Sequence, residues 1–198
     1  MRYAGDAAEG AISKSRGRKK EQAMSKTDEN LKAAFAGESQ ARNKYTFFAQ
    51  VARKEGLHYI AKIFEETAEN EKRHAKDEFV LLDGLGDTAA NLDEAINGEQ
   101  YETITMYPEF AEQAKEDGNM AAARLFMQIA KVEAHHRDRY RKLLERVKNG
   151  TVYKRDEPIK WKCSVCGYIH EGTQPPGKCP CCQHPKEYYE PADMETDI

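Results

Sequence analysis

Apolar residues in the first 150 positions recur at alternating spacings of three and four residues, the period of α-helices that bury one side. Gly56, the turn at residues 83–87 and Gly118 interrupt this pattern. The pattern therefore predicts four helices, at about residues 25–55, 57–82, 91–117 and 119–148. Pro108 costs roughly 3 kcal/mol inside a helix, so we expect a bend or break near Tyr107.

Ionisable residues occupy positions that these helices should bury. The second and fourth helices each carry a Glu-x-x-His pair on the apolar side, and the first and third each place one glutamate there. These residues are Glu38, Glu71, His74, Glu102, Glu133 and His136. A carboxylate-bridged di-metal site in a four-helix bundle is built from this set of ligands.

The alternative is that these side chains are simply solvated, because a single Glu-x-x-His pair arises readily by chance among 34 acidic residues. Burying one unpaired carboxylate, however, costs several kcal/mol. A core containing four of them would not fold without cations. Carboxylate and imidazole ligands suit iron or manganese, so the pattern predicts a redox-active di-metal centre.

The composition changes after residue 148, where four of the five cysteines form two Cys-x-x-Cys pairs. The paired cysteines are Cys163, Cys166, Cys179 and Cys182. Such pairs indicate a tetrahedral metal site in a reducing compartment rather than a disulfide framework. Spacing alone favours structural zinc, whereas a redox di-metal centre favours a single iron as its companion. Cys181 is the spare thiol, and its use in place of Cys182 is the less favoured arrangement.

Taken together, these motifs resemble the rubrerythrin family over roughly residues 27–190. The resemblance includes the rubredoxin pattern Cys-x-x-Cys-Gly-Tyr at 163–168 and Cys-Pro-x-Cys at 179–182. In the helices it rests on Ala34, Phe35, Gly37, Glu38, Ser39, Ala41, Arg42 and Tyr45, then Glu71, His74 and Ala75, then Glu102, Met106, Tyr107 and Pro108, and lastly Glu133 and His136. It implies an all-α ferritin-like four-helix bundle followed by a small, metal-bound rubredoxin-like β domain.

The resemblance also implies a function. Family members of this type are expected to reduce hydrogen peroxide to water at two non-haem irons, as a defence against oxidative stress. Rubredoxin or an NADH-linked reductase would supply electrons through one iron bound by the four cysteines, a site where zinc can substitute. The resemblance further implies a homodimer in the cytoplasm.

Ligand roles follow from the same resemblance. Glu71 and Glu133 would bridge the irons, while Glu38 with His74 and Glu102 with His136 would complete one iron each. Tyr45 and Tyr107 are candidates to hydrogen-bond the ligand carboxylates, or they are plain packing residues. The family carries a further carboxylate one turn after the position matched by Glu102. Thr105 stands there, which puts the exchange of that carboxylate with His74 in doubt.

Two other functions fit parts of the pattern. The bundle could oxidise and store iron, although storage has no use for a thiolate module. Alternatively, the chain could be a structural protein with an inert bundle and a zinc ribbon. The net charge of −3 does not favour nucleic acid, and no apolar stretch is long enough for a membrane span.

The domain organisation follows from these observations. Residues 1–24 are expected to form a disordered extension or expression leader. No apolar segment follows their basic residues, which disfavours a secretory signal, and Asp6, Glu9 and Glu21 weaken the alternative of an organellar presequence. Residues 25–148 form the helical bundle, 149–158 a linker, and 159–198 the domain with four cysteines.

Overall fold

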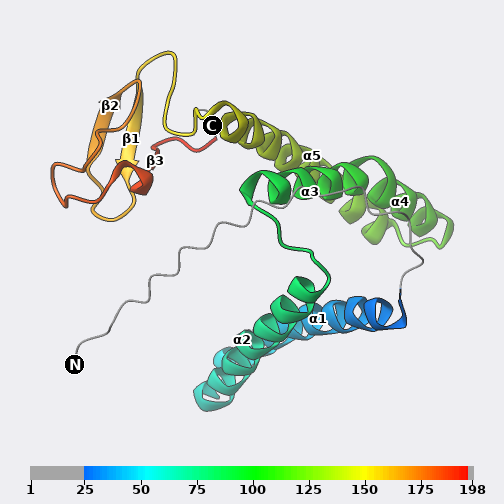
Figure 1. Ribbon diagram of the computed structural model, residues 1–198. Coiled ribbons are helices and arrows are strands. Elements are labelled where there is room, and N and C mark those ends of the chain that lie inside the picture. The colour runs from blue at the N-terminus through cyan, green and yellow to red at the C-terminus, as the bar shows by residue number, and fades with distance from the viewer. Residues whose placement is uncertain (1–24, 196–198) are drawn as a thin grey trace. The chain divides into compact units, whose positions relative to one another are not determined.

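The computed structural model describes residues 25–195, so the prediction for residues 1–24 falls outside the described part of the chain. The protein consists of two compact units, one ending at Gly84 and the other beginning at Leu85. Among the described residues, the first contains two α-helices, and the second contains three α-helices, a π-helical segment, a short 3-10 helix and a small sheet (Figure 1). None of the described helices is both long enough and apolar enough to cross a membrane.

The first unit is a hairpin of α1 (Lys26–Lys54) and α2 (His58–Leu81). Ser25 caps α1 by accepting the amide hydrogen of Asp28 at 3.1 Å, while the Asp28 carboxylate accepts that of Ser25 at 3.2 Å. This reciprocal capping satisfies two amides that the helix leaves free. Gly56, whose φ of +79° favours glycine, turns the chain into α2. Both predicted helices are confirmed to within one residue at their ends.

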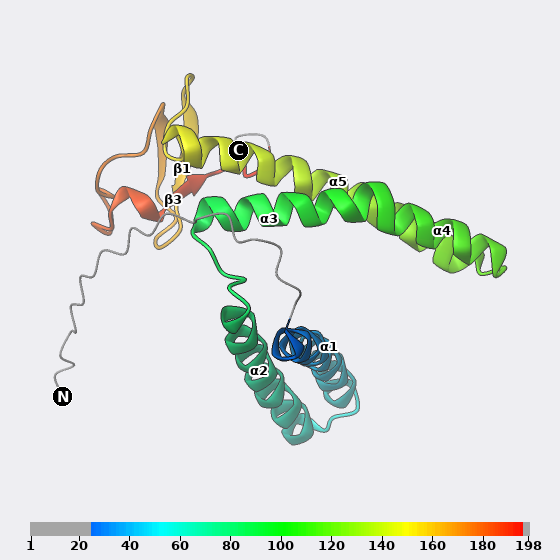
Figure 2. The same ribbon diagram turned by 45° about the vertical axis from the view of Figure 1, so that its right-hand side comes forward.

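Small and aromatic side chains hold this hairpin together. Ala49, Ala52 and Ala61 are buried between α1 and α2, which lie side by side (Figure 2). Phe64 packs against this cluster, and its ring centroid lies 5.6 Å from that of Phe48. Small residues allow the two backbones to approach closely, which brings side chains on the facing sides of both helices within reach of one another.

The second unit begins with α3 (Thr88–Tyr101), a π-helical segment (Glu102–Met106) and α4 (Tyr107–Glu116), which follow one another without a loop. The irregularity expected near Tyr107, a bend or break, is found as a wider, π-helical turn directly before that residue, and the helix continues without a loop. The Tyr107 amide donates to the carbonyl of Glu102, five residues back. A π-helical turn tolerates the proline because the ladder of i to i−4 hydrogen bonds is already interrupted there.

Helix α5 (Met120–Asn149) packs along α3 and α4. The Asn119 side chain caps its first turn by accepting the amide hydrogen of Ala122 at 3.1 Å. Gly150, with φ of +65°, ends it in the left-handed conformation that commonly closes a helix. The third and fourth predicted helices are thus confirmed, with α3 beginning three residues earlier than expected.

The small sheet has the antiparallel order β2-β1-β3, formed by β1 (Ile159–Cys163), β2 (Ile169–Gly172) and β3 (Tyr189–Pro191). Its core consists of Trp161, Cys163, Cys179 and Tyr189, all at most 4% exposed. Residues just before the sheet also contact this core.

Part of the predicted linker packs on the small sheet. Tyr153 lies against the core and donates its hydroxyl hydrogen to the carbonyl of Glu187 at 3.2 Å. The Arg155 guanidinium lies 5.0 Å from the centre of the Trp161 ring. These contacts fix the segment that enters β1 against the domain that follows it.

Candidate metal centres

The hairpin of α1 and α2 brings together Glu38, Glu71 and His74. The Nδ1 atom of His74 lies 2.9 Å from a carboxylate oxygen of Glu71 and 3.8 Å from one of Glu38. Because Glu71 and His74 are three residues apart on α2, they share one side of that helix. Each residue can offer one ligand atom, and these atoms all lie within 4.8 Å of one another.

The helices of the second unit form a matching cluster from Glu99 on α3 and Glu133 and His136 on α5. The Nδ1 atom of His136 lies 2.8 Å from Glu133 and 3.8 Å from Glu99. Its three ligand atoms likewise lie within 4.8 Å of one another. The two clusters therefore have the same composition and nearly the same spacing.

Glu99 is a candidate ligand from the third helix that the sequence pattern did not predict. The sequence pattern named Glu102 for this position, but the structure places Glu99 beside Glu133 and His136, and Glu102 lies outside this cluster. The sequence separations could have indicated Glu99. Glu38 precedes Glu71 by 33 residues in the first pair of helices. In the second pair, Glu99 precedes Glu133 by 34 residues and Glu102 precedes it by 31, so Glu99 matches the first separation more closely. The difference is one helical turn, and it was missed because both glutamates fall near the apolar side of the helix.

Glu99 also bears on the interpretation of Thr105. The missing family carboxylate was sought one turn after Glu102. With Glu99 in the cluster, the residue one turn later is Glu102 itself, at the start of the π-helical segment.

The carboxylates of both clusters are crowded. The pKa of Glu38 is raised, mainly because it shares a hydrogen bond with Glu71 and also because of burial. Burial and then the neighbouring Glu133 raise the pKa of both Glu99 and Glu102. Paired carboxyl groups of this kind must share protons or bind a cation. A donor set of carboxylate oxygens and imidazole nitrogen fits iron or manganese.

The two candidate tyrosines differ in their surroundings. The ring of Tyr45 packs on Phe64 and Phe48, with centroids 6.1 and 6.3 Å away. Tyr107 faces the acidic cluster, since burial and then the charges of Glu102, Glu133 and Glu99 raise its pKa. These surroundings favour a polar role for Tyr107 and a packing role for Tyr45.

The four predicted cysteines of the small domain form one cluster. The Sγ atoms of Cys163 and Cys182 are 3.7 Å apart, and those of Cys166 and Cys179 are 3.6 Å apart. Four thiolates bound at about 2.3 Å to one tetrahedral ion lie roughly 3.8 Å from one another, so these residues fit such an ion. Cys181 is exposed and lies outside the cluster, as expected of the spare thiol.

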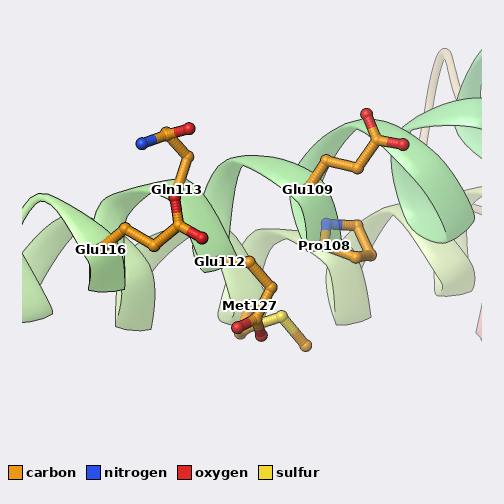
Figure 3. A pocket seen from close by; sticks show the side chains of 6 residues that line it. All are labelled: Pro108, Glu109, Glu112, Gln113, Glu116 and Met127. Carbon is orange, nitrogen blue, oxygen red and sulfur yellow. The ribbon is translucent and has the colours of Figure 1, made fainter.

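A pocket of about 460 Å³ on α4 and α5 contains none of these ligands. Figure 3 shows its lining residues, Pro108, Glu109, Glu112, Gln113, Glu116 and Met127. Its glutamates are exposed, and exposed carboxylates need no bound cation. The candidate chemistry therefore lies in the three ligand clusters.

Comparison with known proteins supports the same two parts, a helical part and a small domain with four cysteines. Residues 29–144 match the model of the rubrerythrin family, and residues 161–190 match that of the rubredoxin-like domain of rubrerythrin. The chain belongs to the rubrerythrin family. Together, this membership and the observed elements confirm the predicted fold class, a ferritin-like helical part with a small rubredoxin-like β domain.

Several rubrerythrins are similar to this chain over most of its length. Rubrerythrin of Porphyromonas gingivalis is 49% identical over 186 residues, covering 87% of this chain and 92% of that protein. Rubrerythrin-1 of Clostridium acetobutylicum is 47% identical, with 83% and 93% covered. A solved structure of partially reduced nigerythrin is 35% identical, covers 88% of this chain and 90% of its own, and superposes with a TM-score of 0.33.

Family membership accounts for the cofactors. The Glu and His clusters correspond to a di-iron carboxylate site, and the cysteine cluster corresponds to the metal of the rubredoxin-like domain. The chain is therefore a di-iron protein with a role in oxidative stress.

Proposed function

We propose that this protein is a non-haem di-iron peroxidase that reduces hydrogen peroxide to water. The observation that carries the proposal is the pair of matched Glu, Glu and His clusters. When bound there, two ferrous ions supply the two electrons that cleavage of the O–O bond requires. The protein's own residues must hold those ions, deliver protons and exclude side reactions.

The proposed ligand roles are those that the family resemblance implied, except that Glu99 takes the place of Glu102. Glu71 and Glu133, the less exposed carboxylate of each cluster at 16% and 13%, would bridge the two ions. Glu38 with His74 and Glu99 with His136 would complete one ion each. Glu102 would be the additional carboxylate, half-buried one turn beyond Glu99.

Protons for the two water molecules would come from groups beside the clusters. Glu99 is not such a group, because a carboxylate that binds a metal ion is deprotonated. Tyr107, whose pKa is raised chiefly by burial, stays protonated and can donate a hydrogen bond from its hydroxyl. A proton held at this hydroxyl need not be drawn from bulk water during the reaction.

Electrons would enter through the rubredoxin-like domain, with iron held by Cys163, Cys166, Cys179 and Cys182. Rubredoxin or an NADH-linked reductase is the proposed donor, and a cytoplasmic homodimer is the proposed form of the enzyme. The thiolate cluster favours this function over iron storage by a ferroxidase, which needs no such electron carrier.

Steady-state turnover tests the proposal. With a reductant supplied through rubredoxin, hydrogen peroxide should be consumed with a higher kcat/KM than dioxygen. A ferroxidase would instead consume ferrous iron and dioxygen, leaving ferric iron with the protein. Peroxide turnover no faster than that of the chain lacking iron would contradict the proposal.

The revised third-helix ligand makes its own prediction. We expect Glu99→Gln to weaken iron binding about 10- to 100-fold or more, since a cluster that loses a charged ligand binds the cation less well. Glu102→Gln should retain both irons and alter turnover instead. Iron titration of the two variants measures this difference, and equal losses in both variants, or a larger loss in Glu102→Gln, would refute the revision.

A further inference from the structure

Tyr189 is a buried tyrosine whose hydroxyl lacks a partner of good hydrogen-bond geometry among the described residues. Only 4% of the residue is exposed. It pairs with Cys163 across β1 and β3, and it shares the domain core with Cys163 and Cys179. Buried tyrosine hydroxyls usually find a hydrogen-bond partner, so this one needs an explanation.

The polar groups that share this core with the hydroxyl are the sulfurs of Cys163 and Cys179, two of the predicted metal ligands. Cys179 is the sulfur beside the hydroxyl, because it is the neighbour that, after burial, raises the pKa of Tyr189 most. A neutral thiol is a weak acceptor, whereas a thiolate bound to a metal is a strong one.

We propose that the Tyr189 hydroxyl donates a hydrogen bond to the Cys179 thiolate when the four cysteines hold iron, and that this bond raises the reduction potential of the iron. The inference rests on the proposed function only in taking the metal to be iron. One-electron reduction adds a negative charge that the four sulfurs share. A donor aimed at one sulfur therefore stabilises the reduced form more than the oxidised form.

Burial strengthens the effect of a single donor on this sulfur, as it would on that of Cys163, the other ligand that is 0% exposed. Cys179 is 0% exposed, so water neither screens its charge nor competes for its lone pairs. Cys166, by contrast, is exposed. The His184 Nδ1 atom lies 3.3 Å from the sulfur of Cys182, which is a separate contact on a different ligand. Tyr189 is thus a positioning residue for the charge of the reduced centre.

The test is Tyr189→Phe in the full, iron-loaded chain. The substitution keeps the ring in the core and removes only the hydroxyl. At a fixed applied potential near the wild-type midpoint, we expect the ratio of reduced to oxidised iron to fall about 3- to 10-fold. A change of this size corresponds to the net free energy of one hydrogen bond. The sulfur-to-iron charge-transfer bands should move to longer wavelength, because the sulfur becomes more electron-rich.

Tyr153→Phe is the matched control. Tyr153 packs on the same core, but its hydroxyl donates to the carbonyl of Glu187 rather than to sulfur. This variant should leave the ratio and the spectrum unchanged. An unchanged ratio in Tyr189→Phe, or an equal change in Tyr153→Phe, would overturn the inference.

A second variant covers the case in which Tyr189→Phe fails to bind iron. Incorporation of 3-fluorotyrosine at position 189 keeps the hydroxyl and makes it a stronger donor, so the ratio of reduced to oxidised iron should rise. A fall or no change would contradict the inference. Either result leaves the proposed function intact as long as the wild-type protein turns over peroxide, so the two proposals fail separately.

Discussion

Replacing Glu133 with glutamine should lower peroxide turnover by about 100-fold or more. Glu133 is the least exposed carboxylate of its cluster at 13%, and its oxygen lies 2.8 Å from His136. Glutamine keeps the size of the side chain but removes the negative charge that balances a ferrous ion. Loss of a group that only orients a metal ligand already costs 10- to 100-fold, so loss of a bridging ligand should cost at least as much.

The variant should also bind less iron in its helical part, while iron bound by the cysteines remains. Visible absorption of the thiolate centre and total iron per chain report the two sites separately. Glu112→Gln is the control, because Glu112 lies in the exposed pocket of α4 and outside every ligand cluster. Full turnover in Glu133→Gln would show that this carboxylate holds no catalytic metal.

Cys179→Ser should abolish turnover that depends on an external electron donor, by about 100-fold or more. Cys179 is fully buried and its sulfur lies 3.6 Å from that of Cys166. A serine hydroxyl is a poor ligand for iron that thiolates select. Because the ordering of such small domains is coupled to metal binding, the sheet should lose stability as well.

The same variant should still react once with peroxide after chemical reduction, since its Glu and His clusters are intact. Stopped-flow absorption of the prereduced protein measures that single turnover. Cys181→Ser provides the control, because Cys181 is an exposed thiol outside the cluster. This substitution should leave both the donor-dependent turnover and the single turnover unchanged. Unimpaired donor-dependent turnover in Cys179→Ser would mean that electrons bypass the thiolate centre.

The parts of this fold that local chemistry determines could be predicted from the sequence. Helix ends follow from capping side chains such as Ser25 and from glycines such as Gly150, which act within one turn. The spacing of the Cys-x-x-Cys pairs determined both the metal site and the exclusion of Cys181. Glu71 with His74 and Glu133 with His136 followed from their three-residue spacing on one helix side.

The third helix could not be predicted as well, because its structure departs from regular helical geometry. A π-helical segment at residues 102–106 changes the angle between successive side chains. A period of 3.6 residues therefore could not distinguish Glu99 from Glu102. The same segment accommodates Pro108, near which the propensity argument predicted a bend or break. The position of Tyr189 against Cys179 depends on how β3 pairs with β1, which spacing alone does not give.

The most direct test of the central claim, that the matched clusters hold a redox-active iron pair, is anaerobic reduction of the iron-loaded protein followed by peroxide. The account predicts that the protein is red, bleaches on reduction, and recovers its colour within one turnover as peroxide is converted to water. It also predicts that Glu133→Gln keeps the colour of the thiolate centre but no longer consumes peroxide. A colourless protein containing zinc, or a reduced protein that leaves peroxide unconsumed, would contradict the claim.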